Sequence, residues 1–297
     1  MESRGQERRD ERRRDFRKAR RAGERIKLLG VTLDLVRLEE IMHHVAAHIA
    51  ARTRFVVANH NAHSVYLMGR NPEFARYFDH ADLTMVDSGP MVLLSRIVGL
   101  NARRFHRWTY LDWRHHFWSL ANRHGWRVFY LGGAPSVPEA AAQALTEKYP
   151  NATIGVRNGY FDATPGSADN TEIVAQITAF QPDVIFVGMG MPRQEVWLLH
   201  HLEQLPPCVT YSIGAAFDYE AGVQYSPPRW AARWGFEWLA RLLADPRRLF
   251  GRYCVEPWFL MGLALRDVAG AVRAGRLFKG FSTPAPSPPS RLTEAQP

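Results

Sequence analysis

The sequence is poor in cysteine and has no long apolar run. Its 297 residues include two cysteines, Cys208 and Cys254, which form no Cys-x-x-Cys motif. Its longest apolar stretch, residues 257–266, has about nine apolar residues, whereas a membrane-spanning helix needs roughly twenty. A signal-peptide pattern is also missing. These absences argue against a disulfide framework and favour a reducing, cytoplasmic setting. They also argue against a membrane span, so that any membrane attachment would be peripheral.

Most of the sequence also lacks excess positive charge, although the whole chain carries a net charge of +9. Residues 26–228 contain sixteen Lys or Arg and eighteen acidic residues. The excess comes from residues 1–25, with eleven basic and six acidic residues, and from residues 229–279, with ten and four. We therefore expect no nucleic-acid partner, a solvated and disordered basic segment at 1–25, and a disordered Pro- and Ser-rich tail at 280–297.

Between these ends, short apolar runs alternate with helical patterns. We expect strands at 28–34, 55–59, 83–87, 127–133, 152–161, 183–188 and 209–214, and helices from about residue 38 and at 65–78, 136–148, 170–180 and 193–203. This alternation predicts an α/β fold with a Rossmann-like, mostly parallel sheet and helices on both faces. Residues 26–228 would form this core, and residues 229–279 a helical, basic C-terminal appendage.

The segment 182–195, PDVIFVGMGMPRQE, is the most informative motif. An apolar strand runs into Gly188 and Gly190, and Pro192 then opens a helix whose free backbone N–H groups would attract an anion such as phosphate. Gly132 and Gly133 follow another apolar strand in the same way. Neither turn completes the dinucleotide fingerprint, because Arg193 stands where a third glycine is needed, so NAD binding is disfavoured.

Polar residues follow the other predicted strands as well. Ligands of open parallel sheets bind beyond the carboxyl ends of the strands, so these residues should share one rim. They are Asn59, Asn61, Asp87, Arg193, Gln194 and Asp218. For Asp87 alone, capping of a helix that starts near Pro90 is the commoner role of an aspartate before a glycine turn.

Histidine pairs provide a weak metal signal. His60 and His63 have the one spacing that could share a helical face, but no recognisable acidic third ligand follows. We expect a surface or supporting role for these histidines, and no metal or other cofactor.

Several motifs occur together in an order that resembles the WecG/TagA/CpsF glycosyltransferases, also called glycosyltransferase family 26. They are ADLTMVDSGPMV, VFYLGGAPSV, NGYF, PDVIFVGMGMPRQE, IGAAFDYEAG and GFEWLARLLADPRRLFGRY, spread over roughly residues 28–254. The resemblance implies inverting, metal-independent transfer of an N-acetylmannosamine-like sugar from a UDP donor to a polyprenyl-diphosphate-linked sugar in cell-surface polysaccharide synthesis. The competing interpretation is a non-catalytic protein of the same fold that binds a nucleotide sugar or nucleic acid.

The resemblance also implies roles for residues of this chain. Asp87 matches the family's essential aspartate and would be the base that accepts the proton of the acceptor hydroxyl. Asn59 and Gln194 would assist at the catalytic centre, although the family usually has threonine at the position of Asn59. The predicted substrate-binding residues are Asn61, Gly132, Gly133, Gly188, Gly190, Arg193, Glu195 and Asp218.

In the family, the C-terminal element meets the membrane. Arg241, Arg248 and Arg252 match arginines of the family. Together with Arg229 and Arg233 of the same segment, they are expected to contact the lipid diphosphate or the inner leaflet of the cytoplasmic membrane. A core helix with a solvated face is the alternative. The chain departs from the family pattern at two places. It lacks the glycine and aspartate that the family usually has soon after the position of Arg104, and it has Ser226 to Pro228, without the usual arginine, before Trp230. The sugar, the polysaccharide and the oligomeric state are not specified.

Overall fold

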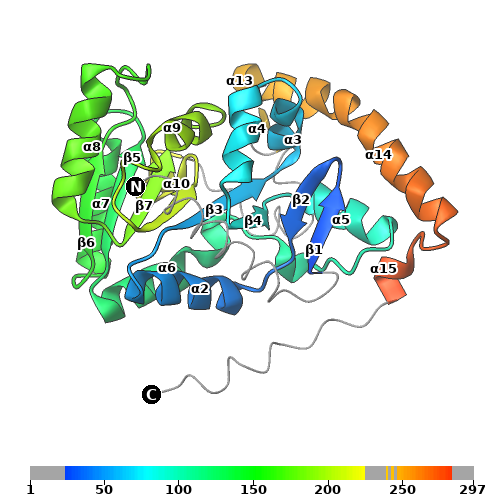
Figure 1. Cartoon of the computed structure of the whole chain (residues 1–297), viewed down its shortest axis with the longest axis horizontal. Helices are drawn as coiled ribbons and strands as arrows, with labels where there is room; N and C mark the ends of the chain where they lie inside the picture. The colour runs from blue at the N-terminus through cyan, green and yellow to red at the C-terminus, as the bar shows by residue number, and fades with distance from the viewer. Residues whose placement is uncertain (1–23, 225–238, 240–241, 244–245, 283–297) are drawn as a thin grey trace.

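The computed structural model describes residues 24–224, 239, 242–243 and 246–282, and its centre is a six-stranded sheet (Figure 1). Every neighbouring pair of its strands is parallel, and their order is β4-β3-β8-β7-β5-β6. The strands are β3 (Phe55–His60), β4 (Leu83–Val86), β5 (Arg127–Gly132), β6 (Thr153–Arg157), β7 (Val184–Gly188) and β8 (Val209–Ser212). The predicted α/β fold with a parallel sheet is confirmed.

Helices cover both faces of this sheet because its strands are apolar on both sides. Val128 and Tyr130 of β5 pack into one core cluster, whereas Phe129 and Leu131 pack into the opposite one, as the two-residue period of a strand requires. The first face is covered by α2 (Leu38–Ala50), α6 (Tyr110–His124), α7 (Val137–Lys148) and α10 (Ala216–Glu220). The second is covered by α4 (Pro72–Asp79), α8 (Ala168–Phe180) and α9 (Arg193–His201).

A third core cluster lies beside β4. It joins the hairpin β1 (Arg25–Leu28) and β2 (Val31–Asp34) to α3 (Ala62–Met68), α5 (Gly89–Ile97) and α14 (Glu256–Arg273). The single strand expected at 28–34 is therefore wrong. Leu29 and Gly30 both have positive φ, 52° and 81°, which reverses the chain into a two-stranded antiparallel sheet.

Two helical predictions also change. The helix expected at 65–78 is two helices, because α3 ends at Gly69 and the Asn71 side chain caps a new helix that starts at Pro72. Sequence patterns did not predict α6, and they indicated α5 only as the helix near Pro90 that Asp87 would cap. Between them, the 3₁₀ turn η1 (Arg104–His106) leads to Arg107, which pairs in parallel with Val86 at the end of β4.

The C-terminal helices lie against the third cluster. α13 (Pro246–Phe250) continues through the π-helical turn η2 (Gly251–Val255) into α14, which runs along one side of the molecule (Figure 1), and α15 (Lys279–Ser282) follows. The N–H of Leu29 donates to the Asp267 carboxylate at 2.6 Å, and the Arg103 guanidinium donates to the carbonyl of Gly280 at 2.6 Å. Within the described part of the chain, no helix is both long enough and apolar enough to cross a bilayer.

His63 of α3 connects the rim of the sheet to the first residue of α14. Its Nδ1 lies 2.8 Å and 2.9 Å from the two carboxylate oxygens of Glu256, and the two side chains are 20% and 13% exposed. Limited exposure should make this pair stronger than a surface pair. A double-mutant cycle with His63→Ala and Glu256→Ala should give a coupling free energy of unfolding of about 1 kcal/mol.

The matched control is the more exposed pair Arg157 and Glu172, 3.3 Å apart, for which a cycle should give a coupling close to zero. Equal couplings for the two pairs would contradict the special role of His63 in holding α14.

Candidate active site

The carboxyl ends of the strands form a common rim, and its centre lies between β5 and β7. The chain leaves β5 for β6 on one side and leaves β7 for β8 on the other, which makes this pair a topological switch point. Gly132 and Gly188 are register partners at the end of the two strands. The predicted glycines therefore meet where ligands of such sheets bind.

Close packing explains why these positions are glycines. A Cβ on Gly132 would overlap the carbonyl of Gly188, and a Cβ on Gly188 would overlap the carbonyl of Gly214 and the Tyr130 hydroxyl. The N–H of Gly133 donates to the Gly188 carbonyl at 3.3 Å. Three strand ends are thus in backbone contact, which leaves peptide groups, instead of side chains, to line the rim.

Gln194 fastens this arrangement from the start of α9. Its side-chain Oε1 accepts hydrogen bonds from the N–H groups of Gly190 and Gly214, both at 3.1 Å, and its Nε2 donates to Glu195 at 2.7 Å. Because both partners of the oxygen are donors, the orientation of the amide is fixed. Gln194 is buried, so its observed role is to hold the loops after β7 and β8 together.

Glu195 lies directly beneath the rim and is fully buried. Its Oε1 accepts the bond from Gln194, and its Oε2 has no hydrogen-bond partner among the described residues. Burial raises the pKa of the Glu195 carboxyl from 4.5 to about 7. Burial first, and the nearby Glu195 carboxylate second, also raise the pKa of Tyr77 on α4. The buried Glu195 carboxyl therefore helps to fix the side chain of Gln194 through this hydrogen bond.

The stability of the protein should depend on the ionisation of Glu195. Because the pKa rises from 4.5 to about 7 on folding, the native state binds more protons between these values, and stability falls as pH rises through them. Glu195→Gln removes this dependence. Relative to wild type, the unfolding free energy of the variant should gain up to about 3 kcal/mol from pH 4.5 to 7 and stay constant above. Urea unfolding across this range measures it, and a pH-independent difference would contradict the burial of an ionisable carboxyl.

The asparagines lie on the other half of the rim. Asn59 donates from Nδ2 to the carbonyl of Ser212 at 2.6 Å, which ties β3 to the end of β8. Asn61 caps α3: its Oδ1 accepts from the N–H of Ser64 at 3.0 Å, while the Ser64 hydroxyl accepts from the N–H of Asn61. Both amides thus have structural partners at the edge where the predicted substrate contacts lie.

Asp87 follows β4, next to Asn61. Its backbone N–H donates to the carbonyl of His60 at 2.9 Å, and its side chain is half-buried. The helix-cap alternative does not hold, because the hydroxyl of Ser88 accepts from the N–H of Met91 and is the cap of α5. Asp87 therefore precedes the cap of α5 and stands at the carboxyl end of β4, on the rim.

Arg193 and Asp218 lie at the β5 and β7 side. The Arg193 guanidinium donates to the carbonyl of Phe161 at 2.6 Å and stacks over the Phe161 ring. Asp218 is in the first turn of α10, close to Gly133, where a Cβ would lie 3.6 Å from its Oδ1. The rim thus carries Asn59, Asn61 and Asp87 at the ends of β3 and β4, and Gly133, Arg193 and Asp218 on the side of β5 and β7. Gln194 lies between the loops after β7 and β8.

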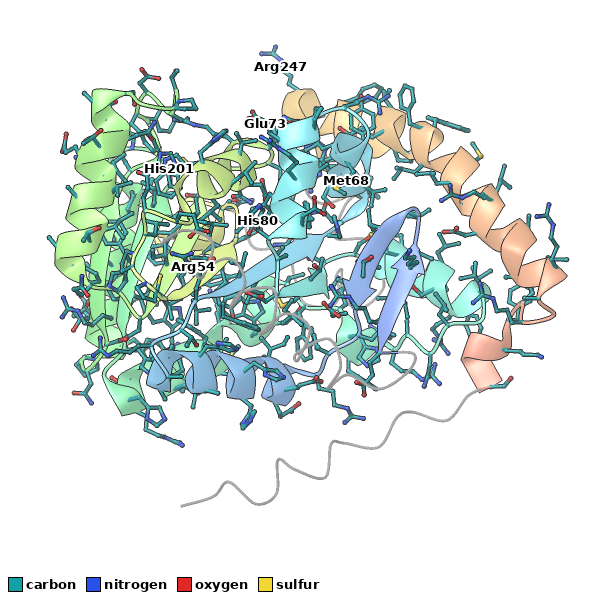
Figure 2. The ribbon with its side chains drawn as sticks, in the orientation of Figure 1. Arg54, Met68, Glu73, His80, His201 and Arg247 are labelled. Atoms are coloured by element: carbon teal, nitrogen blue, oxygen red, sulfur yellow. The ribbon has the colours of Figure 1, made fainter. Side chains whose placement is uncertain are left out.

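The predicted arginines are only partly placed. Arg229, Arg233 and Arg241 lie outside the described residues, Arg248 belongs to α13, and Arg252 lies half-exposed in η2. Arg247, at the start of α13, points away from the rest of the molecule (Figure 2). These positions put cationic residues on the segment that leads into α14.

The histidines are engaged in separate contacts. His60 is buried, with its Nδ1 2.8 Å from the Ser64 hydroxyl, and burial lowers its pKa to about 3, whereas His63 contacts Glu256. Among the described residues, no three His, Cys, Asp or Glu side chains are grouped as metal ligands.

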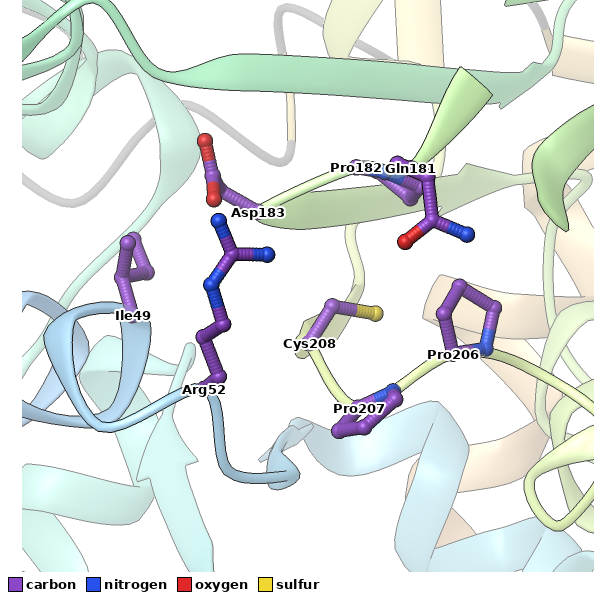
Figure 3. Close-up of a pocket in the computed structure, with 8 residues that line it drawn as sticks. All are labelled: Ile49, Arg52, Gln181, Pro182, Asp183, Pro206, Pro207 and Cys208. Carbon is purple, nitrogen blue, oxygen red and sulfur yellow. The ribbon is translucent and has the colours of Figure 1, made fainter. Parts of the chain in front are cut away.

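A separate cavity of about 230 Å³ lies at the opposite, amino edge of the sheet (Figure 3). Arg52 points into it toward Asp183, and Cys208 lines its wall. Burial raises the pKa of the Cys208 thiol to about 12, so the thiolate is suppressed at neutral pH. None of the predicted site residues lines this cavity.

Residues 26–273 match the sequence profile of the glycosyl transferase WecG/TagA/CpsF family. The chain belongs to this family. It is therefore a hexosyl-transferring enzyme, and the predicted resemblance is confirmed. Two proteins from Staphylococcus aureus strains NCTC 8325 / PS 47 and MRSA252 are each 28% identical over 250 residues, 81% of this chain and 92% of theirs. Both are named N-acetylglucosaminyldiphosphoundecaprenol N-acetyl-beta-D-mannosaminyltransferase.

Two residues of the rim were not predicted. Gly214 donates its N–H to Gln194, and Ser212 supplies the carbonyl bound by Asn59. The sequence did contain a signal, because the strand VTYSIG ends in the same small residues as the other strands of the rim. Which distant side chains these backbone groups would meet depends on the order of the strands in the sheet.

Proposed function

We propose that this glycosyltransferase moves an N-acetylhexosamine of the N-acetylmannosamine type from a UDP donor to N-acetylglucosamine on a polyprenyl diphosphate, with inversion and without a required metal. The observation that carries the proposal is the family match over 26–273, which includes a carboxylate, Asp87, at the rim where such sheets bind ligands. The names of the two staphylococcal relatives supply the sugar and acceptor classes.

In this reaction the acceptor hydroxyl attacks the anomeric carbon from the face opposite the nucleotide. Asp87 accepts the proton of that hydroxyl as the new carbon–oxygen bond forms and the bond to the UDP phosphate breaks. UDP leaves with the electron pair. Backbone N–H groups of the glycine turns after β5 and β7, with Arg193 nearby, would stabilise the developing charge on the diphosphate. Asn59, Asn61 and Asp218 would contact the sugar or nucleotide.

Gln194 fits this proposal as a residue that shapes the pocket. Its oxygen accepts hydrogen bonds from the N–H groups of Gly190 and Gly214, and the second N–H of its Nε2 could donate a hydrogen bond to a substrate. We assign the fixed geometry of the phosphate-facing loops to Gln194 and the proton transfer to Asp87.

The acceptor class implies work at the cytoplasmic membrane surface, and α14 supports that location. Its outward side exposes Trp258, Met261 and Leu265, which are 69%, 42% and 63% exposed, and Arg266 lies beside them. An apolar helical face with basic neighbours suits binding in the interfacial region of a bilayer. We propose peripheral attachment to the inner leaflet through the segment 229–279.

The experiment is a donor panel. Purified full-length protein is incubated in EDTA with UDP-N-acetylhexosamines or their uronic acids, with or without a lipid-diphosphate-linked N-acetylglucosamine, and released UDP is measured. Release that requires the acceptor and persists in EDTA supports the proposal. Dependence on added Mg²⁺ would overturn metal independence, and absence of release with every donor would favour a different donor class or a non-catalytic binder.

A further inference from the structure

A groove of about 350 Å³ lies between the β1–β2 hairpin, α3 and α14. Its lining is mostly apolar, with Leu29, Val31, Val65, Met68, Phe259 and Leu263. Met68, at the end of α3, lies on the side of the molecule that α14 occupies (Figure 2). The polar side chains of the lining are Tyr66 and Arg70, so a peptide bound here would find few hydrogen-bond partners for its amide groups. This lining suits a hydrocarbon chain.

The groove opens beside the exposed apolar side of α14. Phe259, which lines the groove, is 55% exposed, and Trp258 and Leu265 on the same helix are more exposed still. Apolar side chains gathered at a surface mark a contact with another molecule or a membrane. The groove and the exposed apolar side chains therefore share one helix, α14.

A cation lies at this groove. The Arg70 guanidinium stacks over the rings of Tyr66 and Phe259, at 3.8 Å and 4.6 Å from their centroids. No acidic side chain in the described part of the chain pairs with it. The stacking and a hydrogen bond from Nη1 to the Tyr66 carbonyl at 3.5 Å hold the planar group in place. Because Arg70 is exposed, its remaining N–H groups can bind phosphate oxygens.

The distance between the rim and the groove matches the length of the polar part of a lipid-linked sugar. Asn61 caps α3 at the rim, the helix ends at Met68 in the groove, and its seven residues span about 10 Å. A hexose and a diphosphate in series have a similar length, roughly 10 Å by ordinary bond lengths. An acceptor whose sugar hydroxyl reaches Asp87 would thus place the start of its lipid near Met68.

We infer that this groove is the lipid subsite: it holds the first isoprene units of the polyprenyl acceptor, with Arg70 on the diphosphate at its mouth. The inference rests on the proposed function, since it takes the acceptor class from there. It assigns the recognition of the lipid to α3, the hairpin and α14, and leaves recognition of the donor to the glycine turns.

The groove can be filled without disturbing the fold. Gly69 lines it, has a φ of −84°, and a Cβ there would meet nothing within 4 Å. Gly69→Phe should place its ring in the groove. The matched control is Gly262→Phe on the exposed side of α14, where a Cβ also meets nothing within 4 Å.

Binding of farnesyl diphosphate and of inorganic diphosphate is measured by calorimetry on the full chain. Wild type should bind farnesyl diphosphate at least about tenfold more tightly, because each buried CH₂ adds about 0.8 kcal/mol. Gly69→Phe should lose this difference and keep wild-type affinity for UDP, and Gly262→Phe should behave like wild type. Equal binding of the two probes by wild type, or an unchanged difference in Gly69→Phe, would overturn the lipid subsite.

Arg70→Gln tests the cation separately. It should weaken the binding of farnesyl diphosphate by about ten- to a hundredfold and leave farnesol binding unchanged, because a charge-assisted contact to phosphate contributes roughly 1.5–3 kcal/mol. Equal losses for both probes would show that Arg70 acts only through its stacking. These binding tests use no sugar donor, so failure of the proposed function would appear in the donor panel with the farnesyl preference intact.

Discussion

Asp87→Asn should lower the rate of sugar transfer by roughly 10²–10⁴-fold and leave the affinity for UDP near that of wild type, because a general base contributes to the transition state and little to donor binding. The amide has the same shape as the carboxylate, and the helix that follows is capped by Ser88, so the fold should not change. Single-turnover transfer and UDP calorimetry measure the two effects.

Asp79→Asn is the control for this variant, since Asp79 is exposed at the end of α4, before β4 begins, whereas the rim follows the other end of β4. It should transfer at the wild-type rate. Near-normal transfer by Asp87→Asn would remove Asp87 from the role of base, and loss of UDP binding would assign it to the donor site instead.

Gly188→Ala should be the most damaging single-methyl change in the rim. The added Cβ would overlap the carbonyl of Gly214 and the Tyr130 ring, and Gly214 cannot retreat freely because Gln194 holds its N–H. Overpacking at a rigid site costs about 3 kcal/mol, so the unfolding midpoint should fall markedly and UDP affinity should fall with it.

Gly262→Ala is the matched substitution. A Cβ there meets nothing within 4 Å on an exposed helix, so alanine should leave stability unchanged or raise it by up to about 1 kcal/mol. Equal effects of the two alanines on the melting temperature would contradict the contact between the ends of β5, β7 and β8.

The strands were predictable because they are buried on both faces and form short apolar runs that end in glycine or polar residues. VIFVG, residues 184–188, shows the pattern: each of its residues is buried, alternate side chains enter opposite core clusters, and the rim follows directly. The residues of the predicted rim could be found for the same reason. Their assignment to catalysis or binding needed the resemblance to the family.

What the sequence could not predict depended on contacts between distant segments or on local turns. The strand expected at 28–34 failed because Leu29, an unusual residue for positive φ, begins a reversal there. The prediction of one helix at 65–78 was wrong because the apolar periodicity continues through this segment, although Gly69 and Asn71 mark the end of one helix and the start of the next. Without the family motif, the sequence alone would have predicted Gln194 and Glu195 to be ordinary surface residues. Their burial follows from Gly214, 20 residues from Gln194, which the strand order brings to the rim.

We propose that this protein transfers a sugar to a lipid-linked acceptor with Asp87 as the base. The most direct measurement is the mass spectrum of a farnesyl-diphosphate-linked N-acetylglucosamine after incubation with UDP-N-acetylmannosamine in EDTA, with wild type and with Asp87→Asn. We expect an acceptor heavier by one N-acetylhexosamine with wild type and almost none with the variant. An unmodified acceptor with wild type, or equal product with both proteins, would contradict it.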